Sequence, residues 1–155
     1  MDNDDYRAIA NIVARFALHL DSHDYAAVAE LFSDMTYRSP GIDYEVSGTD
    51  DLAVFYERVL TEMNERWAGD PEDALTVGHK HAFTNLIVEF DEPRISATCN
   101  YYGTVFSFSD KKPYQPRWSG RYYDRFERKN GEWRIVERTQ VTDYPRGYVP
   151  QVDRP

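Results

Sequence analysis

The sequence contains very little cysteine: Cys99 is the only one among 155 residues. It can form neither an intrachain disulfide nor a cysteine-based metal site. A chain that folds without disulfides suits a reducing compartment, so we expect a cytoplasmic protein. Cys99 lies in a segment with apolar patterning and has no catalytic signature near it. We therefore expect it to be a core residue.

Long apolar runs and an excess of basic charge are also missing. No segment approaches the roughly 20 apolar residues of a membrane-spanning helix, and charged residues stand at the N-terminus where a secretory signal would be apolar. The 18 basic and 27 acidic side chains give a net charge of -9. Phosphate binding needs a basic surface, so we expect neither nucleic acid nor a membrane as partner. The sequence has no phosphate-loop, serine-nucleophile or dinucleotide motif, and we predict no cofactor.

Aromatic residues, in contrast, are abundant: the chain has 12 Tyr, 8 Phe and 3 Trp. They concentrate in the second half, whereas the first half has helical periodicity. Apolar residues recur every three to four positions over residues 4–20 and 48–66, and Asp24 is placed to cap a short helix between them. These patterns predict three helices, with a short strand at residues 35–38.

Long segments rich in aromatic and β-branched residues follow, at residues 79–90, 94–108, 117–128 and 132–144. The Asn130-Gly131 pair between the last two is a strong hairpin signal. Three helices followed by long strands predict an α+β fold, in which a curved antiparallel or mixed sheet wraps against the helices. We expect one domain over residues 1–144 and an extended, proline-containing tail over 145–155. The aromatic outer face of such a sheet predicts a homo-oligomer, either a dimer or a trimer.

Asp21 and His81 form the most informative pair of polar residues. Asp21 lies at the end of the first predicted helix, and His81 lies on a predicted strand. A carboxylate that orients an imidazole can remove a proton at neutral pH, because neutral imidazole has a reference pKa near 6.5. If the two residues meet in a pocket, they predict an acid/base enzyme. The alternative is that His81 is a hydrogen-bonded core histidine.

His79 shares a strand face with His81, which raises the alternative of a His-x-His metal site. Such a site needs a third ligand, commonly a carboxylate a few residues further on, and residues 82–88 contain none. We therefore predict no metal. We expect His79 to line the mouth of a cavity or to meet solvent.

Several stretches together resemble a known family: residues 16–25, 31–34, 81–85, 120–128 and 130–135. Their order and spacing resemble the SnoaL-like branch of the nuclear-transport-factor-2-like superfamily, and the likeness covers about residues 4–144. Members of this branch include scytalone dehydratase, hexachlorocyclohexane dehydrochlorinase and polyketide cyclases. The superfamily also has members without catalytic activity, so the resemblance addresses fold more directly than function.

The resemblance implies a cone-shaped α+β barrel with an apolar cavity between sheet and helices. It implies that Asp21 orients His81 as the general base and that Arg138, on the last strand, helps the leaving anion. Leu20 stands where the dehydratase has a tyrosine, and residues 94–108 contain no second histidine. For the cavity walls and substrate contacts we predict five aromatic residues: Tyr37, Phe55, Tyr102, Trp118 and Tyr122.

These expectations favour a cofactor-independent lyase or isomerase of the dehydratase, dehydrohalogenase or cyclase type. It would act on a hydrophobic small molecule through Asp21 and His81, with Arg138 or a tyrosine stabilising the developing charge. Two alternatives stay open at this point. One is a small-molecule-binding domain with the same pocket and no chemistry, and the other is an accessory subunit that binds a partner protein through the outer face of the sheet.

Overall fold

The computed structural model describes residues 3–39, 42–69, 73 and 76–143. Its helices are α1 (Asn3–Asp21), α2 (Tyr25–Ala29) and α3 (Thr49–Ala68). Its strands are β1 (Phe32–Ser39), β2 (Ile42–Val46), β3 (Gly78–Phe90), β4 (Ser96–Phe108), β5 (Gln115–Lys129) and β6 (Glu132–Thr142). None of the helices in the described residues combines the length and the apolar composition that a membrane-spanning helix requires.

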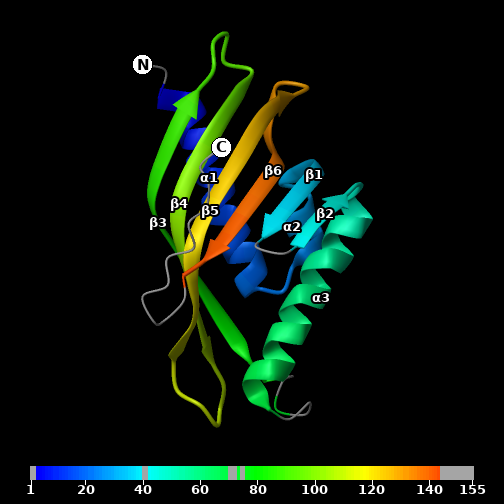
Figure 1. Cartoon of the computed structure of the whole chain (residues 1–155), viewed down its shortest axis with the longest axis vertical. Coiled ribbons are helices and arrows are strands. Elements are labelled where there is room, and N and C mark those ends of the chain that lie inside the picture. The colour runs from blue at the N-terminus through cyan, green and yellow to red at the C-terminus, as the bar shows by residue number, and fades with distance from the viewer. Residues whose placement is uncertain (1–2, 40–41, 70–72, 74–75, 144–155) are drawn as a thin grey trace.

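The strands form one mixed sheet in the order β2-β1-β6-β5-β4-β3. Neighbouring strands are antiparallel except β1 and β6, which are parallel. Figure 1 shows long, twisted strands, with α1 running behind β3, β4 and β5 and with α3 beside the short strands β1 and β2. The predicted α+β fold with a mixed sheet against N-terminal helices is confirmed. In the described part of the chain the sheet stays open, with β2 and β3 as its edges.

Local sequence signals explain where several elements begin and end. Asp24 caps α2 by accepting a hydrogen bond from the Ala27 backbone N–H at 3.1 Å. Gly69 ends α3 in a left-handed conformation, with a φ of 78°. The β5–β6 hairpin turns at Asn130 and Gly131, whose φ values of 53° and 86° match a two-residue hairpin turn. The predicted cap and hairpin are thus confirmed.

The sequence does not predict β2. Its five residues, IDYEV, alternate between apolar and acidic side chains, but this short stretch is assigned to no element in the sequence analysis. The predicted strand at residues 35–38 is longer than expected, because β1 pairs with β2 on one side and with β6 on the other. The predicted tail at residues 145–155 lies outside the described residues.

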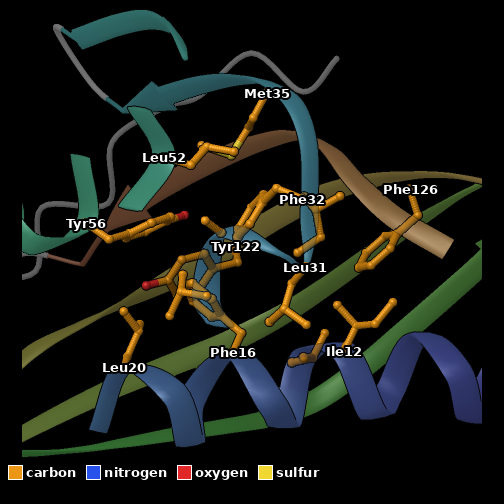
Figure 2. Packing of buried hydrophobic residues seen from close by; sticks show 14 of the residues in the cluster. Ile12, Phe16, Leu20, Leu31, Phe32, Met35, Leu52, Tyr56, Tyr122 and Phe126 are labelled. Carbon is orange, nitrogen blue, oxygen red and sulfur yellow. The ribbon is translucent and has the colours of Figure 1, made fainter. Parts of the chain in front are cut away.

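The core lies between the inner face of the sheet and the helices. Figure 2 shows Phe16 and Leu20 of α1 beneath Tyr56 of α3, Phe32 of β1 and Tyr122 of β5. The Phe16 ring lies 5.9 Å from Phe32 and 5.5 Å from Tyr56, between ring centroids, in edge-to-face geometry. An aromatic cluster that joins α1 and α3 to the sheet therefore surrounds the interior in which a site can form.

Alternation along β4 identifies the face of the sheet that meets the helices. Ala97, Cys99, Tyr101, Gly103 and Val105 are buried, whereas the residues that alternate with them are more exposed. Burial raises the pKa of the Cys99 thiol to about 12, so the thiol stays protonated at neutral pH. The predicted core position of Cys99 is confirmed.

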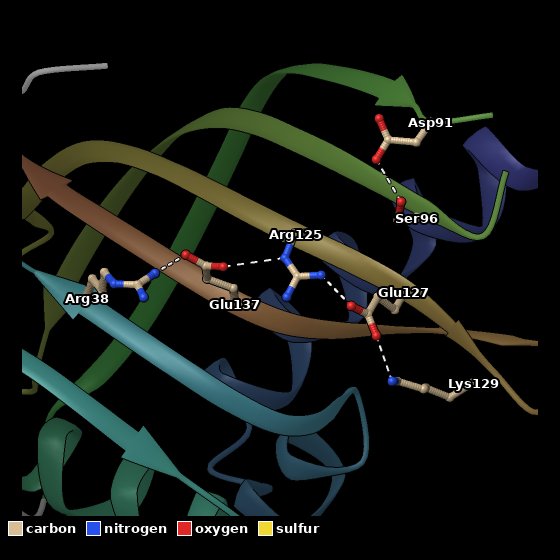
Figure 3. A network of polar contacts seen from close by, with 7 residues as sticks. All are labelled: Arg38, Asp91, Ser96, Arg125, Glu127, Lys129 and Glu137. Atoms are coloured by element: carbon tan, nitrogen blue, oxygen red, sulfur yellow. Dashed lines mark hydrogen bonds and ion pairs between the residues drawn. The ribbon is translucent and has the colours of Figure 1, made fainter. Parts of the chain in front are cut away.

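The outer face of β1, β6 and β5 carries a ladder of paired charges. Arg38 contacts Glu137, which also accepts from Arg125 Nε at 3.4 Å, and Arg125 and Lys129 both contact Glu127 (Figure 3). Each exposed pair contributes only about 0–1 kcal/mol. The ladder interrupts the aromatic outer face from which we predicted a homo-oligomer. Dimer or trimer formation stays a prediction.

Candidate active site

Asp21 and His81 meet where the end of α1 packs against the edge strand β3. The Asp21 Oδ1 atom lies 2.7 Å from His81 Nδ1 and accepts a hydrogen bond from the His81 backbone N–H at 3.0 Å. Both side chains are buried, with 8% and 4% of their surface exposed. The other carboxylate oxygen, Oδ2, lies 3.6 Å from Lys80 Nζ. Three contacts therefore hold the carboxylate in place.

The contact with Asp21 decides which nitrogen of His81 can act as a base. An ionised carboxylate only accepts hydrogen bonds, so Nδ1 carries the proton and Nε2 keeps its lone pair. Among the described residues, Arg121 Nε is the only fully buried side-chain nitrogen or oxygen without a partner. His81 Nε2 also makes no hydrogen bond with these residues. Because it is not among the fully buried atoms without a partner, it must be accessible. Because His81 lines a cavity, the lone pair is available to a bound molecule.

The cavity lies between α1, α3 and the inner face of the sheet. The centre of a water molecule can move through about 80 Å³ of it. One bound water needs about 10–15 Å³ on this measure, so the space holds several waters or a small organic molecule. Polar groups reach it from His81, Arg138, Gln140 and the tyrosines, and aliphatic side chains form much of the wall: Leu20, Val59, Leu60, Met63 and Val105.

Four of the five predicted aromatic residues line this cavity, namely Tyr37, Phe55, Trp118 and Tyr122. Tyr102 does not. It lies on the outer face of β4 with 50% of its surface exposed. Successive side chains of a strand point to opposite faces, and Tyr101 takes the inward position. This corrects the prediction for Tyr102, while substrate contact by the other four stays a prediction.

Arg138 of β6 reaches the same cavity, but its charge is already paired. Its Nε and Nη2 atoms lie 2.8 Å and 2.6 Å from the carboxylate of Asp124, and both side chains are fully buried. The guanidinium carbon lies 4.0 Å from the centroid of the Phe16 ring. The guanidinium also contacts the hydroxyls of Tyr56 at 3.2 Å and Tyr101 at 3.0 Å. The site thus holds a neutral ion pair where the resemblance implies a cation for the leaving anion.

A family model described as a SnoaL-like domain matches residues 2–139 of the chain. The chain belongs to the SnoaL-like family. No curated protein sequence matches this chain. The match covers α1 with Asp21 and the part of β6 that contains Arg138, and it confirms the family resemblance seen in the sequence.

Solved structures similar to this SnoaL-like domain cover most of its length. Aln2 from a Streptomyces species has a TM-score of 0.75 and 17% identity, over 92% of this chain and 94% of that one. A scytalone dehydratase-like protein from Novosphingobium aromaticivorans has a TM-score of 0.70 and 19% identity, over 92% and 87%. LinA has a TM-score of 0.71 and 17% identity, over 91% and 87%. These likenesses show the fold.

Several polar residues of this SnoaL-like site are ones that the sequence analysis does not single out. The sequence could have indicated the importance of Asp124, because this residue shares a face of β5 with Tyr122 and Phe126. An acidic residue among buried aromatic residues needs a partner for its charge. Gln140 lines the cavity, and its Oε1 atom accepts a hydrogen bond from Tyr37 at 2.7 Å. Nothing in the sequence indicated that Gln140 lines a cavity, since a polar residue on a strand is usually exposed.

His79 lies deeper in the SnoaL-like domain than the sequence indicates. Only 2% of it is exposed, its Nε2 atom contacts the side-chain oxygen of Asn64, and its Nδ1 atom lies 3.1 Å from the Ser107 hydroxyl. Burial, helped by the neighbouring His81, lowers the pKa of His79 to about 4. The prediction that His79 lines the cavity mouth or meets solvent is therefore wrong. No cluster of three His, Cys, Asp or Glu side chains suited to a metal occurs among the described residues.

The lowered pKa of His79 predicts a loss of stability in mild acid. The unfolded chain takes up this proton near pH 6.5, whereas the folded protein does so near pH 4. Between these values the unfolded state binds more protons, so the free energy of unfolding should fall by about 3 kcal/mol as the pH falls through the window. Urea unfolding of wild type and His79→Gln at pH 7 and pH 4 checks this. Between pH 7 and pH 4 the free energy of unfolding should fall less for the variant than for the wild type. An equal fall in both proteins would show that His79 is not the cause.

Proposed function

We propose that this SnoaL-like domain is a cofactor-independent acid/base enzyme that removes a proton from a hydrophobic small molecule and expels a leaving group. The observation that carries the proposal is the orientation of His81. Asp21 holds its Nδ1 atom at 2.7 Å, which leaves Nε2 for a molecule in the apolar cavity. In this proposal the enzyme is a lyase of the dehydratase or dehydrohalogenase type. A cyclase or an isomerase would share the same first step.

In the proposed reaction, His81 Nε2 takes a proton from a carbon atom of the bound molecule. The electron pair of the broken C–H bond forms a new double bond, and the leaving group departs with the pair of its own bond. Asp21 stabilises the imidazolium, and the His81 backbone N–H fixes the carboxylate. A positioned general base typically contributes about 10² to 10⁴ in rate. That contribution is sufficient where the C–H bond is acidic and the leaving group is good.

The surroundings of His81 support this role. The ring of His79 lies 6.3 Å from that of His81, between centroids, and its lowered pKa keeps it neutral at pH 7. It therefore adds no positive charge to oppose the imidazolium. Aromatic and aliphatic walls reduce competition from water for the lone pair of Nε2.

The proposal is tested with nitrobenzisoxazole. A base removes the acidic ring C–H proton of this probe, its N–O bond breaks, and a coloured phenolate forms. We expect the wild-type protein to open the probe with a kcat/KM at least about 10²-fold above the second-order rate constant of free imidazole at the same pH. An unreactive aromatic compound of similar size should inhibit by filling the cavity. A rate constant no greater than that of imidazole would contradict the proposal.

A further inference from the structure

Tyr56 brings a further polar group to the cavity that His81 lines. Figure 2 shows its side chain reaching from α3 towards the sheet, with the hydroxyl oxygen at its tip, near Tyr122 and above Phe16. Only 6% of the residue is exposed. Its hydroxyl oxygen accepts a hydrogen bond from Arg138 Nη1 at 3.2 Å. Tyr56 is thus fixed by packing on one side and by a cationic donor on the other.

The proton of the Tyr56 hydroxyl is free for a bound molecule. Arg138 is the donor in the contact with Tyr56, and the proton of Tyr56 has no acceptor in the part of the chain that the structure describes. The neighbouring Tyr101 differs, because its hydroxyl donates to Asp124 Oδ2 at 2.8 Å. Burial raises the pKa of Tyr56 above its usual range, so the hydroxyl keeps its proton at neutral pH. Tyr56 is therefore a permanent donor at the cavity wall.

Arg138 is less suited to meet a negative charge. A guanidinium has five N–H groups. Those on Nε and Nη2 are directed at Asp124 and Tyr101, and one of the two on Nη1 is directed at Tyr56. Asp124 also neutralises its charge. The hydrogen bond that Arg138 donates nevertheless polarises the Tyr56 hydroxyl and makes it a stronger donor in turn.

We infer that Tyr56 is a catalytic residue whose hydroxyl donates a hydrogen bond to the leaving group as negative charge develops there, with Arg138 behind it as a positioning residue. This inference rests on the proposed function, because the charge develops only when His81 removes a proton. The proton of the C–H bond goes to His81 Nε2, and the leaving atom takes the electron pair of its bond. Tyr56 keeps its own proton throughout. One preorganised donor of this kind typically contributes about 10² to 10³ in rate.

The test compares wild type with Tyr56→Phe on a series of benzisoxazoles whose substituents change the acidity of the departing phenol. His81 removes the proton from the same carbon in every member, so the series mainly varies the charge left on oxygen. We expect kcat/KM of the variant to fall about 10²-fold with the poorest leaving group and only a few-fold with the best. A plot of log kcat/KM against the pKa of the phenol should therefore be steeper for Tyr56→Phe. Parallel plots would overturn the inference.

Tyr101→Phe is the matched control. It removes a hydroxyl that contacts the same Arg138–Asp124 pair, but Tyr101 is not part of the cavity wall. Its plot should run parallel to that of the wild type. An equally steep plot for Tyr101→Phe would assign the effect to the ion pair and overturn the role of Tyr56. A His81→Ala variant distinguishes failure of the Tyr56 inference from failure of the proposed function. A wild-type rate in that variant would contradict the proposed function, because His81 could then not be the base.

Binding of nitrophenolate gives a readout that does not need turnover. Above the pKa of nitrophenol, this probe presents the same kind of oxygen anion as the opened benzisoxazole. A hydrogen bond to a charged group is worth about 1.5–3 kcal/mol, so wild type should bind the phenolate at least about 10-fold more tightly than Tyr56→Phe. Neutral nitrobenzene should bind both proteins equally. Equal phenolate affinities would overturn the inference even if neither protein opened the benzisoxazole.

Discussion

Replacement of His81 with alanine should lower kcat/KM for nitrobenzisoxazole by about 10² to 10⁴. The variant loses the Nε2 atom that takes the proton, and it keeps the apolar walls that bind the probe. Absorbance of the phenolate product measures the rate, and circular dichroism verifies that the variant is folded. Added imidazole should restore part of the rate, because it can occupy the space that the side chain leaves.

Asp21→Asn should lower kcat/KM for nitrobenzisoxazole by a similar factor, although the imidazole of His81 is still present. The amide can accept the His81 backbone N–H, but it carries no charge to stabilise the imidazolium. Its NH₂ group can also donate to Nδ1, which would place the proton on Nε2 and remove the base. Asp24→Asn is the matched control. Asp24 lies in the same turn and caps α2, and asparagine is an equally good cap.

Two outcomes would contradict this pair of predictions. Full activity in Asp21→Asn, together with loss in His81→Ala, would leave His81 as a base that works without the carboxylate. Full activity in both variants would show that neither Asp21 nor His81 takes part in the elimination, and it would contradict the proposed mechanism. Nitrogen-15 shifts of the imidazole separate a tautomer change from a loss of charge, because they report which ring nitrogen of His81 carries the proton.

The fold could be predicted because its elements have strong local patterns. The helical spacing before Leu20, the cap at Asp24 and the turn at Asn130 and Gly131 each favour one local structure, and all of them agree with an α+β fold. β2 is different, because its short strand is stabilised by pairing with β1 rather than by its own residues. The alternation of apolar and acidic residues in IDYEV is a local signal of only five residues, and the partner strand that the segment pairs with is known only from the structure.

The site could be predicted only in part. Asp21 and His81 carried a chemical signal, and the structure brings them within 2.7 Å. Tyr102 was placed on the wrong face, although the pattern of Cys99 and Tyr101 already assigned the inward positions of β4. The burial of His79 depends on Asn64 and Ser107, which come from other elements. Such partners are known only once the helices and strands are packed.

The Arg138–Asp124 pair connects the stability of the fold to the chemistry of the site. The two residues lie directly opposite each other on β6 and β5, and both side chains are fully buried. Arg138 of this pair donates hydrogen bonds to the hydroxyls of Tyr56 and Tyr101, and its guanidinium packs over the Phe16 ring. A charge in this position is tolerated only because its partner is present, so removal of one member should affect the whole interior.

Arg138→Met should therefore be strongly destabilising. The substitution leaves the Asp124 carboxylate buried without its cation, and breaking a buried ion pair in this way costs about 3–5 kcal/mol. Methionine is flexible and fills irregular space, so contact with the Phe16 ring should be largely kept. Urea unfolding at pH 7 measures the change, and the midpoint should shift to lower urea with little change in the slope.

Two further variants separate the effect of charge from that of packing. Adding Asp124→Leu to Arg138→Met removes the stranded carboxylate and should restore much of the lost free energy of unfolding. Arg125→Met is the matched control on the outer face of β5, where an exposed guanidinium contacts Glu137, and it should cost at most about 1 kcal/mol. If Arg138→Met costs no more than Arg125→Met, the buried pair does not stabilise the fold. Its position behind Tyr56 would then have to be explained by the chemistry of the site alone.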